Sequence, residues 1–183
     1  MKVRYFALLL VTISLTSCGA RKGVPSATQK AQEKSAGYAD LPDFIDLTDE
    51  VIEDLETETF NIIDHALQFL GTKYKYGGTT PDGMDCSGLV YTCFLQNDIS
   101  LPRSSKEMAQ LGEQLELGNV RTGDLLFFIT DRRKKNINHV GLVVELDADN
   151  IYFIHSSTSR GVIISALNEN YWRDHFVMAR RIL

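Results

Sequence analysis

Three side chains in this 183-residue chain have the types that nucleophilic catalysis needs. Cys86 follows Asp85 and opens a run of apolar residues at helical spacing, so it is predicted at a helix N-terminus. His139 and His155 lie in two segments rich in Val, Ile and Phe, which the turn-forming residues 147–150 separate. The attacking form of cysteine is the thiolate, which a helix N-terminus and a neighbouring imidazole both favour. These residues predict acyl transfer through a cysteine thiol if the fold brings them together.

The pairing register of two predicted strands decides whether the histidines meet. The strands are expected at 139–146 and 151–157, and the numbers of directly opposed residues should sum to about 296–298. An even sum places His139 and His155 diagonally on one face of the sheet, whereas a sum of 297 places them on opposite faces. The register is therefore a structural test of the catalytic hypothesis.

Other uses of the same residue types remain open at this point. A cysteine at a helix start is often a small buried hydrophobe, and a histidine in a strand often serves only the structure. Cys86, His139 and His155 also match the ligand count of a Cys/His₂ zinc site, although the helix-start position favours a nucleophile. Cys93 lies two turns beyond Cys86 on the same helix, too far for a disulfide, and is predicted to be a core residue.

The elements that must position these residues are predicted as helices first and strands afterwards. Apolar spacing indicates helices over about 59–70, from Cys86 to about 97, and over 103–114. Strands are predicted at 125–129, 139–146, 151–157, 162–167 and 177–183. This order indicates an α+β fold in which N-terminal helices pack on an antiparallel sheet of five to six strands.

Charge divides the chain into three regions. Residues 1–39 hold six basic residues and one acidic residue, and residues 40–58 hold nine acidic residues and no basic one. Residues 59–183 are almost neutral, with 13 basic and 14 acidic residues. The net charge of −5 argues against nucleic acid as a partner.

The first 58 residues are predicted to direct the export of the chain and to tether the rest of it to a membrane. Two basic residues precede an apolar run that is too short to span a bilayer and ends at Leu15-Thr16-Ser17-Cys18. This segment resembles a bacterial lipoprotein signal, which implies a signal peptide over 1–17, cleavage before Cys18 and lipid on Cys18. An ordinary signal peptide or an anchor helix is the alternative. Residues 18–39 read as a flexible linker and residues 40–58 as an acidic arm.

Six short motifs stand in order along the rest of the chain, and together they resemble one family. They are Tyr74-Lys75-Tyr76-Gly77-Gly78, Asp85-Cys86-Ser87-Gly88, Leu101-Pro102-Arg103-Ser104, Arg121-Thr122-Gly123-Asp124-Leu125, His139-Val140-Gly141 and His155-Ser156-Ser157. The chain is similar to the NlpC family of papain-like cell-wall cysteine endopeptidases, and to its small lipoprotein murein endopeptidases in particular. The resemblance covers residues 59–183 and implies a papain-like cysteine peptidase core there, with the nucleophile at a helix N-terminus.

The resemblance also implies a role for each matching residue. Cys86 is the expected nucleophile, His139 the general base and later the acid, and His155 the residue that orients the His139 ring. Tyr74 is expected near the oxyanion site, together with the backbone N–H of Cys86. Substrate-binding roles are expected at Asp85, Ser87 and Arg103, with support of the loop as the alternative for Arg103. Tyr171 and Trp172 are predicted to pack rather than to bind substrate.

The function that the resemblance implies is hydrolysis of peptide bonds in peptidoglycan stem peptides or cross-links, through a thioester and without a metal or organic cofactor. The expected partners are peptidoglycan and, through the lipid on Cys18, a membrane of the bacterial envelope facing the periplasm. The chain is expected to be a monomer, and which bond is cut and which membrane holds the lipid are left open. The alternatives are a non-catalytic wall-binding or regulatory lipoprotein, and a papain-like amidase or acyltransferase on another substrate.

Overall fold

A computed structural model of the chain describes residues 49–131, 133 and 135–183. The predicted signal peptide, the predicted lipidation site Cys18, the predicted linker and the first part of the acidic arm lie outside these residues. The helices are α2 (Asp49–Gln68), α3 (Cys86–Leu95), α4 (Ser105–Met108) and α5 (Asn170–His175), with a 3₁₀ turn η1 (Leu117–Asn119). The strands are β1 (Thr79–Thr80), β2 (Gly83–Met84), β3 (Glu113–Leu115), β4 (Leu125–Phe128), β5 (His139–Leu146), β6 (Ile151–Ser157), β7 (Gly161–Ala166) and β8 (Phe176–Arg181).

Six of these strands form one antiparallel sheet in the order β3-β8-β4-β5-β6-β7, and β1 and β2 form a separate small hairpin. The expected α+β fold with a five- to six-stranded antiparallel sheet is thereby confirmed. Strands β5 and β6 cover the predicted ranges in full, while β3 was not predicted.

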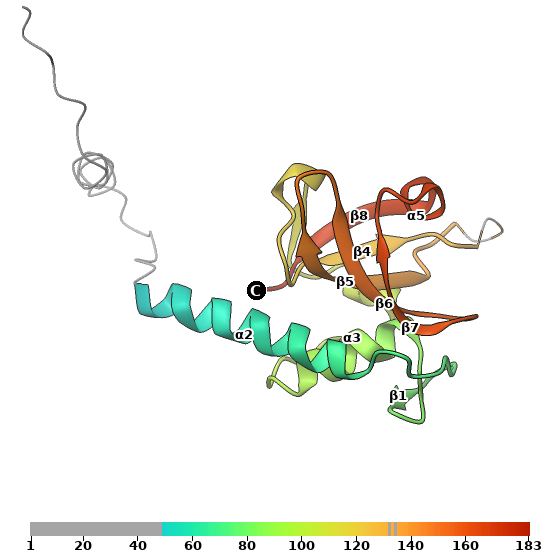
Figure 1. Cartoon of the computed structure of the whole chain (residues 1–183), viewed down its shortest axis with the longest axis horizontal. Coiled ribbons are helices and arrows are strands. Elements are labelled where there is room, and N and C mark those ends of the chain that lie inside the picture. Colours follow the sequence, from blue (N-terminus) through green and yellow to red (C-terminus); the bar gives the residue numbers. More distant parts are fainter. Residues whose placement is uncertain (1–48, 132, 134) are drawn as a thin grey trace, which may run out of the picture. The chain divides into compact units, whose positions relative to one another are not determined.

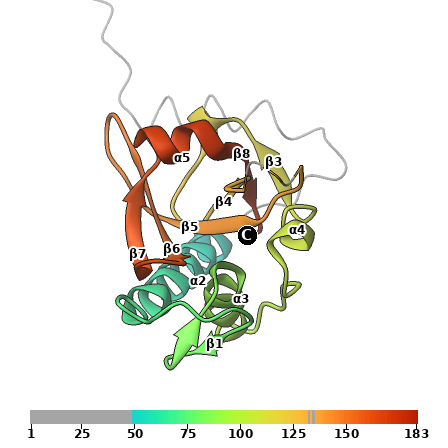
Figure 2. The ribbon, with the colours of Figure 1, turned by 90° about the vertical axis from the view of Figure 1, so that its right-hand side faces the viewer.

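Helices α2 and α3 lie on one side of the sheet and α5 on the other (Figures 1 and 2). Each side has its own apolar layer. Leu125 and Phe127 of β4 pack with α2 and α3, whereas Leu126 and Phe128, which alternate with them, pack with Trp172 of α5. Both faces of the central strands are therefore buried, and a polar side chain on either face must find its partners inside the protein.

Helix α2 begins ten residues before the predicted start at residue 59 and takes in the second half of the acidic stretch. Ile62 and Ala66 are fully buried against the sheet, while residues 53–57 are exposed. Acidic side chains near a helix N-terminus are stabilised by the helix dipole, so this half needs little packing to be helical. In the described part of the chain, no helix has both the length and the apolar character to cross a membrane.

The helix predicted over 103–114 is wrong, because only the single turn α4 forms there. Ser104 caps that turn by accepting a hydrogen bond from the Glu107 N–H at 3.3 Å and donating one to the Glu107 carboxylate at 2.6 Å. The chain then enters β3, which pairs with β8 from the far end of the sequence. Such long-range pairing overrides local spacing and leaves no local signal.

Candidate active site

Cys86 is the first residue of α3, as predicted, and Asp85 is its N-cap. The Asp85 Oδ1 accepts a hydrogen bond from the Gly88 N–H at 2.7 Å, which satisfies one of the free donors of the first turn. A side chain at Gly88 would collide with the Gly78 carbonyl. The glycine thus lets the preceding loop close over the start of the helix, next to the nucleophile.

A network centred on Asp85 holds this loop in place. Arg103 forms a bidentate ion pair with the Asp85 carboxylate at 2.9 and 3.0 Å, and also donates to the Ser87 Oγ and the Gly78 carbonyl. The second Asp85 oxygen accepts from the Gly77 N–H at 2.7 Å. The three expected substrate-binding residues therefore bind one another, and their role toward substrate stays a prediction.

The register of β5 and β6 changes between the turn and the histidines. Near the turn Glu145 opposes Tyr152, which gives a sum of 297, whereas beyond Val144 the residue Val143 opposes Phe153, which gives 296. A β-bulge between Val143 and Glu145 absorbs the extra residue. The even register therefore holds at the histidine end of the hairpin, so His139 and His155 share a face, as the catalytic hypothesis requires.

The two histidines form a buried hydrogen-bonded pair. The Nε2 of His139 lies 3.1 Å from the Nδ1 of His155, with the rings nearly perpendicular. On its other side, the Nε2 of His155 lies 3.1 Å from the Oγ of Ser165 on β7. His139 therefore has Nδ1 left to serve a nucleophile, which fits the geometry of a general base.

Aromatic rings enclose this pair. Trp172 of α5 stacks on the His139 ring with centroids 5.3 Å apart and meets the His155 ring edge-on at 4.5 Å. Phe128 and Phe153 lie 6.0 and 5.1 Å from the same two rings. Trp172 does pack, as predicted, and the rings that it contacts are the two imidazoles. This contact depends on helix α5, which was not predicted from the sequence.

The sulfur of Cys86 lies against the main chain on both sides of His139. It is 4.0 Å from the Asn138 carbonyl oxygen, and the N–H of Val140 is close enough to lower its pKa. The main chain that flanks the general-base candidate at the start of β5 therefore lies next to the nucleophile. Cys93, which was predicted to be a core residue, is fully buried and has a free thiol.

Tyr74 is half-buried in the loop that precedes the nucleophile. Its pKa is raised by burial and then by the negative charges of Cys86, once that thiol is ionised, and of Asp85, which places its hydroxyl in their field. A bridge pairs it with Met84, whose carbonyl accepts a 2.7 Å hydrogen bond from Ser156 on β6. The tyrosine expected near the oxyanion site is thus fixed to the segment that leads into the nucleophile.

Burial keeps the catalytic candidates neutral. It raises the pKa of Cys86 to about 11, although the N–H groups of Val140, Ser87 and Cys86 itself lower it. The N–H groups at the helix start therefore lower the pKa of Cys86, as expected, but burial outweighs them. Burial also lowers the pKa of His139 to about 4 and that of His155 to about 2, where the adjacent His139 adds to the effect.

The zinc interpretation finds no support in the described residues. Between residues 49 and 183, leaving aside 132 and 134, no three or more His, Cys, Asp or Glu side chains are grouped as ligands for a metal ion. The nitrogens of His139 and His155 face each other instead.

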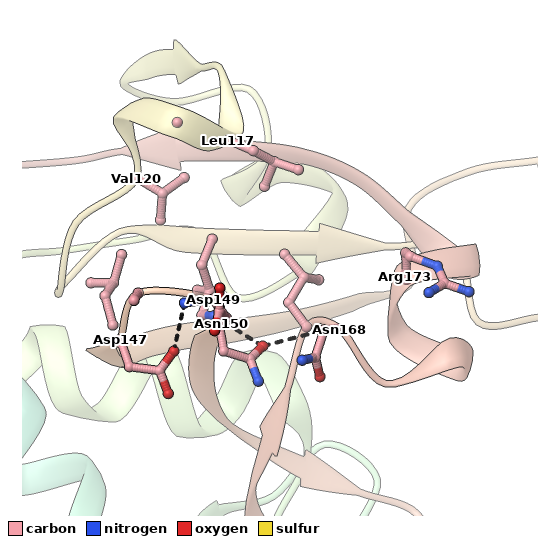
Figure 3. A pocket seen from close by; sticks show the side chains of 12 residues that line it. Leu117, Val120, Asp147, Asp149, Asn150, Asn168 and Arg173 are labelled. Carbon is pink, nitrogen blue, oxygen red and sulfur yellow. Dashed lines mark hydrogen bonds between the residues drawn. The ribbon is translucent and has the colours of Figure 1, made fainter.

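A surface hollow of about 420 Å³ lies elsewhere on the domain (Figure 3). Its lining comes from η1, the β5–β6 turn and the segment around Asn168 and Arg173. His139 starts β5 and His155 lies toward the end of β6, so the hollow is at the opposite end of that hairpin from the candidate site. None of the candidate catalytic residues lines it.

Comparisons with known families, proteins and structures match the part of the chain that holds this site. The NlpC/P60 family profile matches residues 71–181. The chain is 31% identical over 182 residues to the murein DD-endopeptidase MepS/murein LD-carboxypeptidase of Escherichia coli (strain K12), which covers 99% of this chain and 93% of that protein. It is 37% identical over 141 residues to the gamma-DL-glutamyl hydrolase of Bacillus subtilis (strain 168), covering 74% of this chain and 33% of that one.

A solved structure of an NlpC/P60 family protein from Bacillus cereus has the same fold, with a TM-score of 0.62 and 32% identity. The match covers 68% of this chain and 40% of the other, so this chain spans less than half the length of that protein.

Proposed function

Because the chain belongs to the NlpC/P60 family, we propose that it is a cysteine endopeptidase that hydrolyses peptide bonds in peptidoglycan stem peptides or cross-links. The observation that carries the proposal is the buried His139–His155 pair, set at the strand end where the Cys86 sulfur lies. A wall-binding scaffold has no need of a nucleophile at a helix start beside two hydrogen-bonded imidazoles. The named relatives, a murein endopeptidase and a gamma-DL-glutamyl hydrolase, support hydrolysis.

In the proposed acylation step, the Cys86 sulfur attacks the carbonyl carbon of the scissile bond and its proton passes to Nδ1 of His139. Since the thiol and the imidazole are both neutral at rest, proton transfer accompanies the attack. The tetrahedral intermediate collapses, the C–N bond breaks, and the Nδ1 proton moves to the leaving amine. A thioester between Cys86 and the acyl part remains.

In the proposed deacylation step, a water molecule gives a proton to Nδ1 of His139 and attacks the thioester carbon. The carbon–sulfur bond breaks, the carboxylic acid product leaves, and the proton returns to the sulfur of Cys86. In both steps the developing oxyanion is met by the backbone N–H of Cys86 and the hydroxyl of Tyr74. Donors of this kind typically contribute about 10²–10³ in rate.

Purified sacculi test the proposal. Wild type is expected to release muropeptides, identified by mass spectrometry, and Cys86→Ala is expected to release none. Cys93→Ala is the matched control, because it removes the other buried thiol of the same helix and is expected to remain active. Unchanged muropeptides with wild type would contradict the enzyme and favour a wall-binding protein. Activity that resists iodoacetamide but falls with a chelator would favour a metal site.

The masses of the products identify the bond. The two relatives bear names for different bonds, so both a cross-link and a bond within the stem are candidates. Cleavage of a cross-linked dimer to monomers would assign the first, and release of a shortened stem the second. Acyl transfer to another nucleophile, or turnover only of non-wall amides, would favour the acyltransferase or amidase alternative.

The proposal extends to the N-terminus on sequence alone. We infer that Cys18 is lipidated after cleavage and holds a monomeric enzyme on a membrane of the bacterial envelope, facing the periplasm. Palmitate labelling is expected for wild type and Cys86→Ala and should be absent in Cys18→Ala. Labelling that survives Cys18→Ala would contradict the lipid anchor.

A further inference from the structure

Three polar side chains form a diagonal row across strands β5, β6 and β7. His155 is directly opposite Ile163, so Ser165, two residues further along β7, lies on the same face as His155. His139 has the same diagonal relation to His155 on the other side. The row therefore runs from His139 through His155 to Ser165, with one residue from each strand.

Ser165 is buried in this row. Only 4% of the surface of Ser165 is exposed, and its Oγ lies 3.1 Å from the Nε2 of His155. Across the strands it is directly opposite Phe153, one of the rings that enclose the histidines. In this apolar setting, a polar atom of His155 that loses its hydrogen-bond partner cannot form a hydrogen bond with water instead.

The positions of the hydrogens in the row determine whether His139 is a base. If His139 carries its hydrogen on Nε2, it donates to Nδ1 of His155, and Nδ1 of His139 keeps a lone pair for the thiol proton. His155 then carries its hydrogen on Nε2, which must donate to Ser165 Oγ. In the opposite arrangement Ser165 donates to His155, His155 donates to His139, and Nδ1 of His139 already holds a hydrogen.

We propose that Ser165 is a positioning residue that accepts the Nε2–H of His155 and thereby selects the histidine tautomers in which His139 is a base. The inference rests on the proposed function of the site. Without the hydroxyl, the Nε2–H of His155 is buried without an acceptor, and buried N–H groups without a partner are rarer in proteins than acceptors without one. The tautomer equilibrium of His139 and His155 then shifts toward the arrangement in which Nδ1 of His139 carries a hydrogen and cannot accept the thiol proton.

The matched variants are Ser165→Thr and Ser165→Val, made in the full chain carrying Cys18→Ser. Threonine and valine have the same shape, and only threonine keeps a hydroxyl, so both variants strain the packing equally. On a soluble cross-linked muropeptide we expect Ser165→Val to lower kcat by about 10- to 100-fold with KM unchanged. Ser165→Thr should stay within about threefold of wild type. Equal kcat for the two variants would overturn the proposal.

A second measurement reports the tautomers directly and does not depend on activity. In ¹⁵N-labelled imidazole NMR spectra, wild type and Ser165→Thr should show Nε2–H on both His139 and His155, and Ser165→Val should show a shift toward Nδ1–H. Identical tautomers in all three proteins would overturn the role of Ser165. If wild type cleaves no muropeptide but the tautomers respond as expected, the proposed function fails while the positioning role stands.

Discussion

The thiol of Cys86 lies at a helix N-terminus and is also shut off from water, and these surroundings act on its pKa in opposite directions. The dipole at a helix end contributes about 0.3–1 kcal/mol at exposed sites and up to about 2 kcal/mol in partly buried ones. One pKa unit corresponds to about 1.4 kcal/mol. The rise of the Cys86 pKa from 9.0 to about 11 therefore shows desolvation outweighing the helix end.

Alkylation of Cys86 should reflect this raised pKa. We expect its rate of reaction with iodoacetamide to keep increasing with pH up to at least pH 10, because the thiolate fraction keeps growing until the pH approaches about 11. Peptide mapping by mass spectrometry separates Cys86 from Cys93, which burial also protects. A rate that levels off below pH 8 would show a thiolate–imidazolium pair at rest and contradict the neutral site.

Trp172 should contribute to turnover through its stack on His139. Ring pairs of this kind contribute about 0.5–1.5 kcal/mol beyond simple burial, so Trp172→Phe is expected to lower kcat by about 3- to 10-fold. Tyr171→Phe is the control, because it alters an exposed neighbour on the same helix and should leave kcat unchanged. A Trp172→Phe enzyme with the kcat of wild type would show that the stack only fills space.

At the level of elements, the Asp85 network joins a loop, a helix start and Arg103. Arg103→Lys replaces a bidentate ion pair by a single contact and should lower the free energy of unfolding by about 1–2 kcal/mol, since the arginine is partly exposed. Arg173→Lys, in the exposed pair with Asp174, should change it by less than about 0.5 kcal/mol. Urea unfolding measures both, and equal effects would show that the network adds no stability.

The β-bulge predicts an asymmetry between two changes of strand length. Deleting Val144 leaves Val143 and Glu145 opposite their present partners, so both histidines keep their face, and activity should stay within about tenfold of wild type. Inserting one alanine after Gly141 moves His139 to the other face and should abolish activity. Circular dichroism checks that each variant is folded, and an active insertion variant would refute the register argument.

The sequence was informative where a local pattern governs an element. The cap at Asp85, the start of α3 at Cys86 and the full extents of β5 and β6 follow from spacing and turn residues alone. Where distant segments meet, the spacing was misleading: β3 pairs with β8, and the predicted helix over 103–114 gives way to it. The early start of α2 was missed because residues 53–57, just before the predicted start, are exposed and carry no stripe of buried apolar side chains.

For the site, the sequence identified the candidate catalytic residues but not the residues that hold them in position. Cys86, His139 and His155 have informative types, and only the parity of the register was undecided. Trp172 is the single tryptophan of the chain and Ser165 is one of many serines, and neither type by itself distinguishes a residue of the site from a packing residue. Their importance comes from β7 and α5 folding back onto the histidines, a contact between distant segments that only three-dimensional structure records.

The whole domain should be acid-sensitive because it buries two neutral histidines. Their pKa values are about 4 and about 2 when folded, against about 6.5 when unfolded, so the unfolded chain binds more protons below pH 6.5. Stability is then fully present above about pH 6.5 and falls as the pH drops toward 4. We expect the urea midpoint to be lower at pH 5 than at pH 7.5.

A matched variant isolates the histidines in that measurement. His155→Gln removes one buried imidazole and should flatten the dependence of the urea midpoint on pH between 7.5 and 5. The same midpoint at both values for wild type, or an unchanged slope in His155→Gln, would show that other groups govern acid stability.

The diagonal row of His139, His155 and Ser165 also has a consequence for the order in which the molecule is made. A ribosome completes Cys86 and its helix long before β7 and α5, so the nascent chain holds the nucleophile without the groups that complete its base. A chain that has been cleaved before Ser165 lacks the same groups. We therefore expect full activity only after β7 and α5 have folded onto the histidines, and reduced activity in a chain that has lost them.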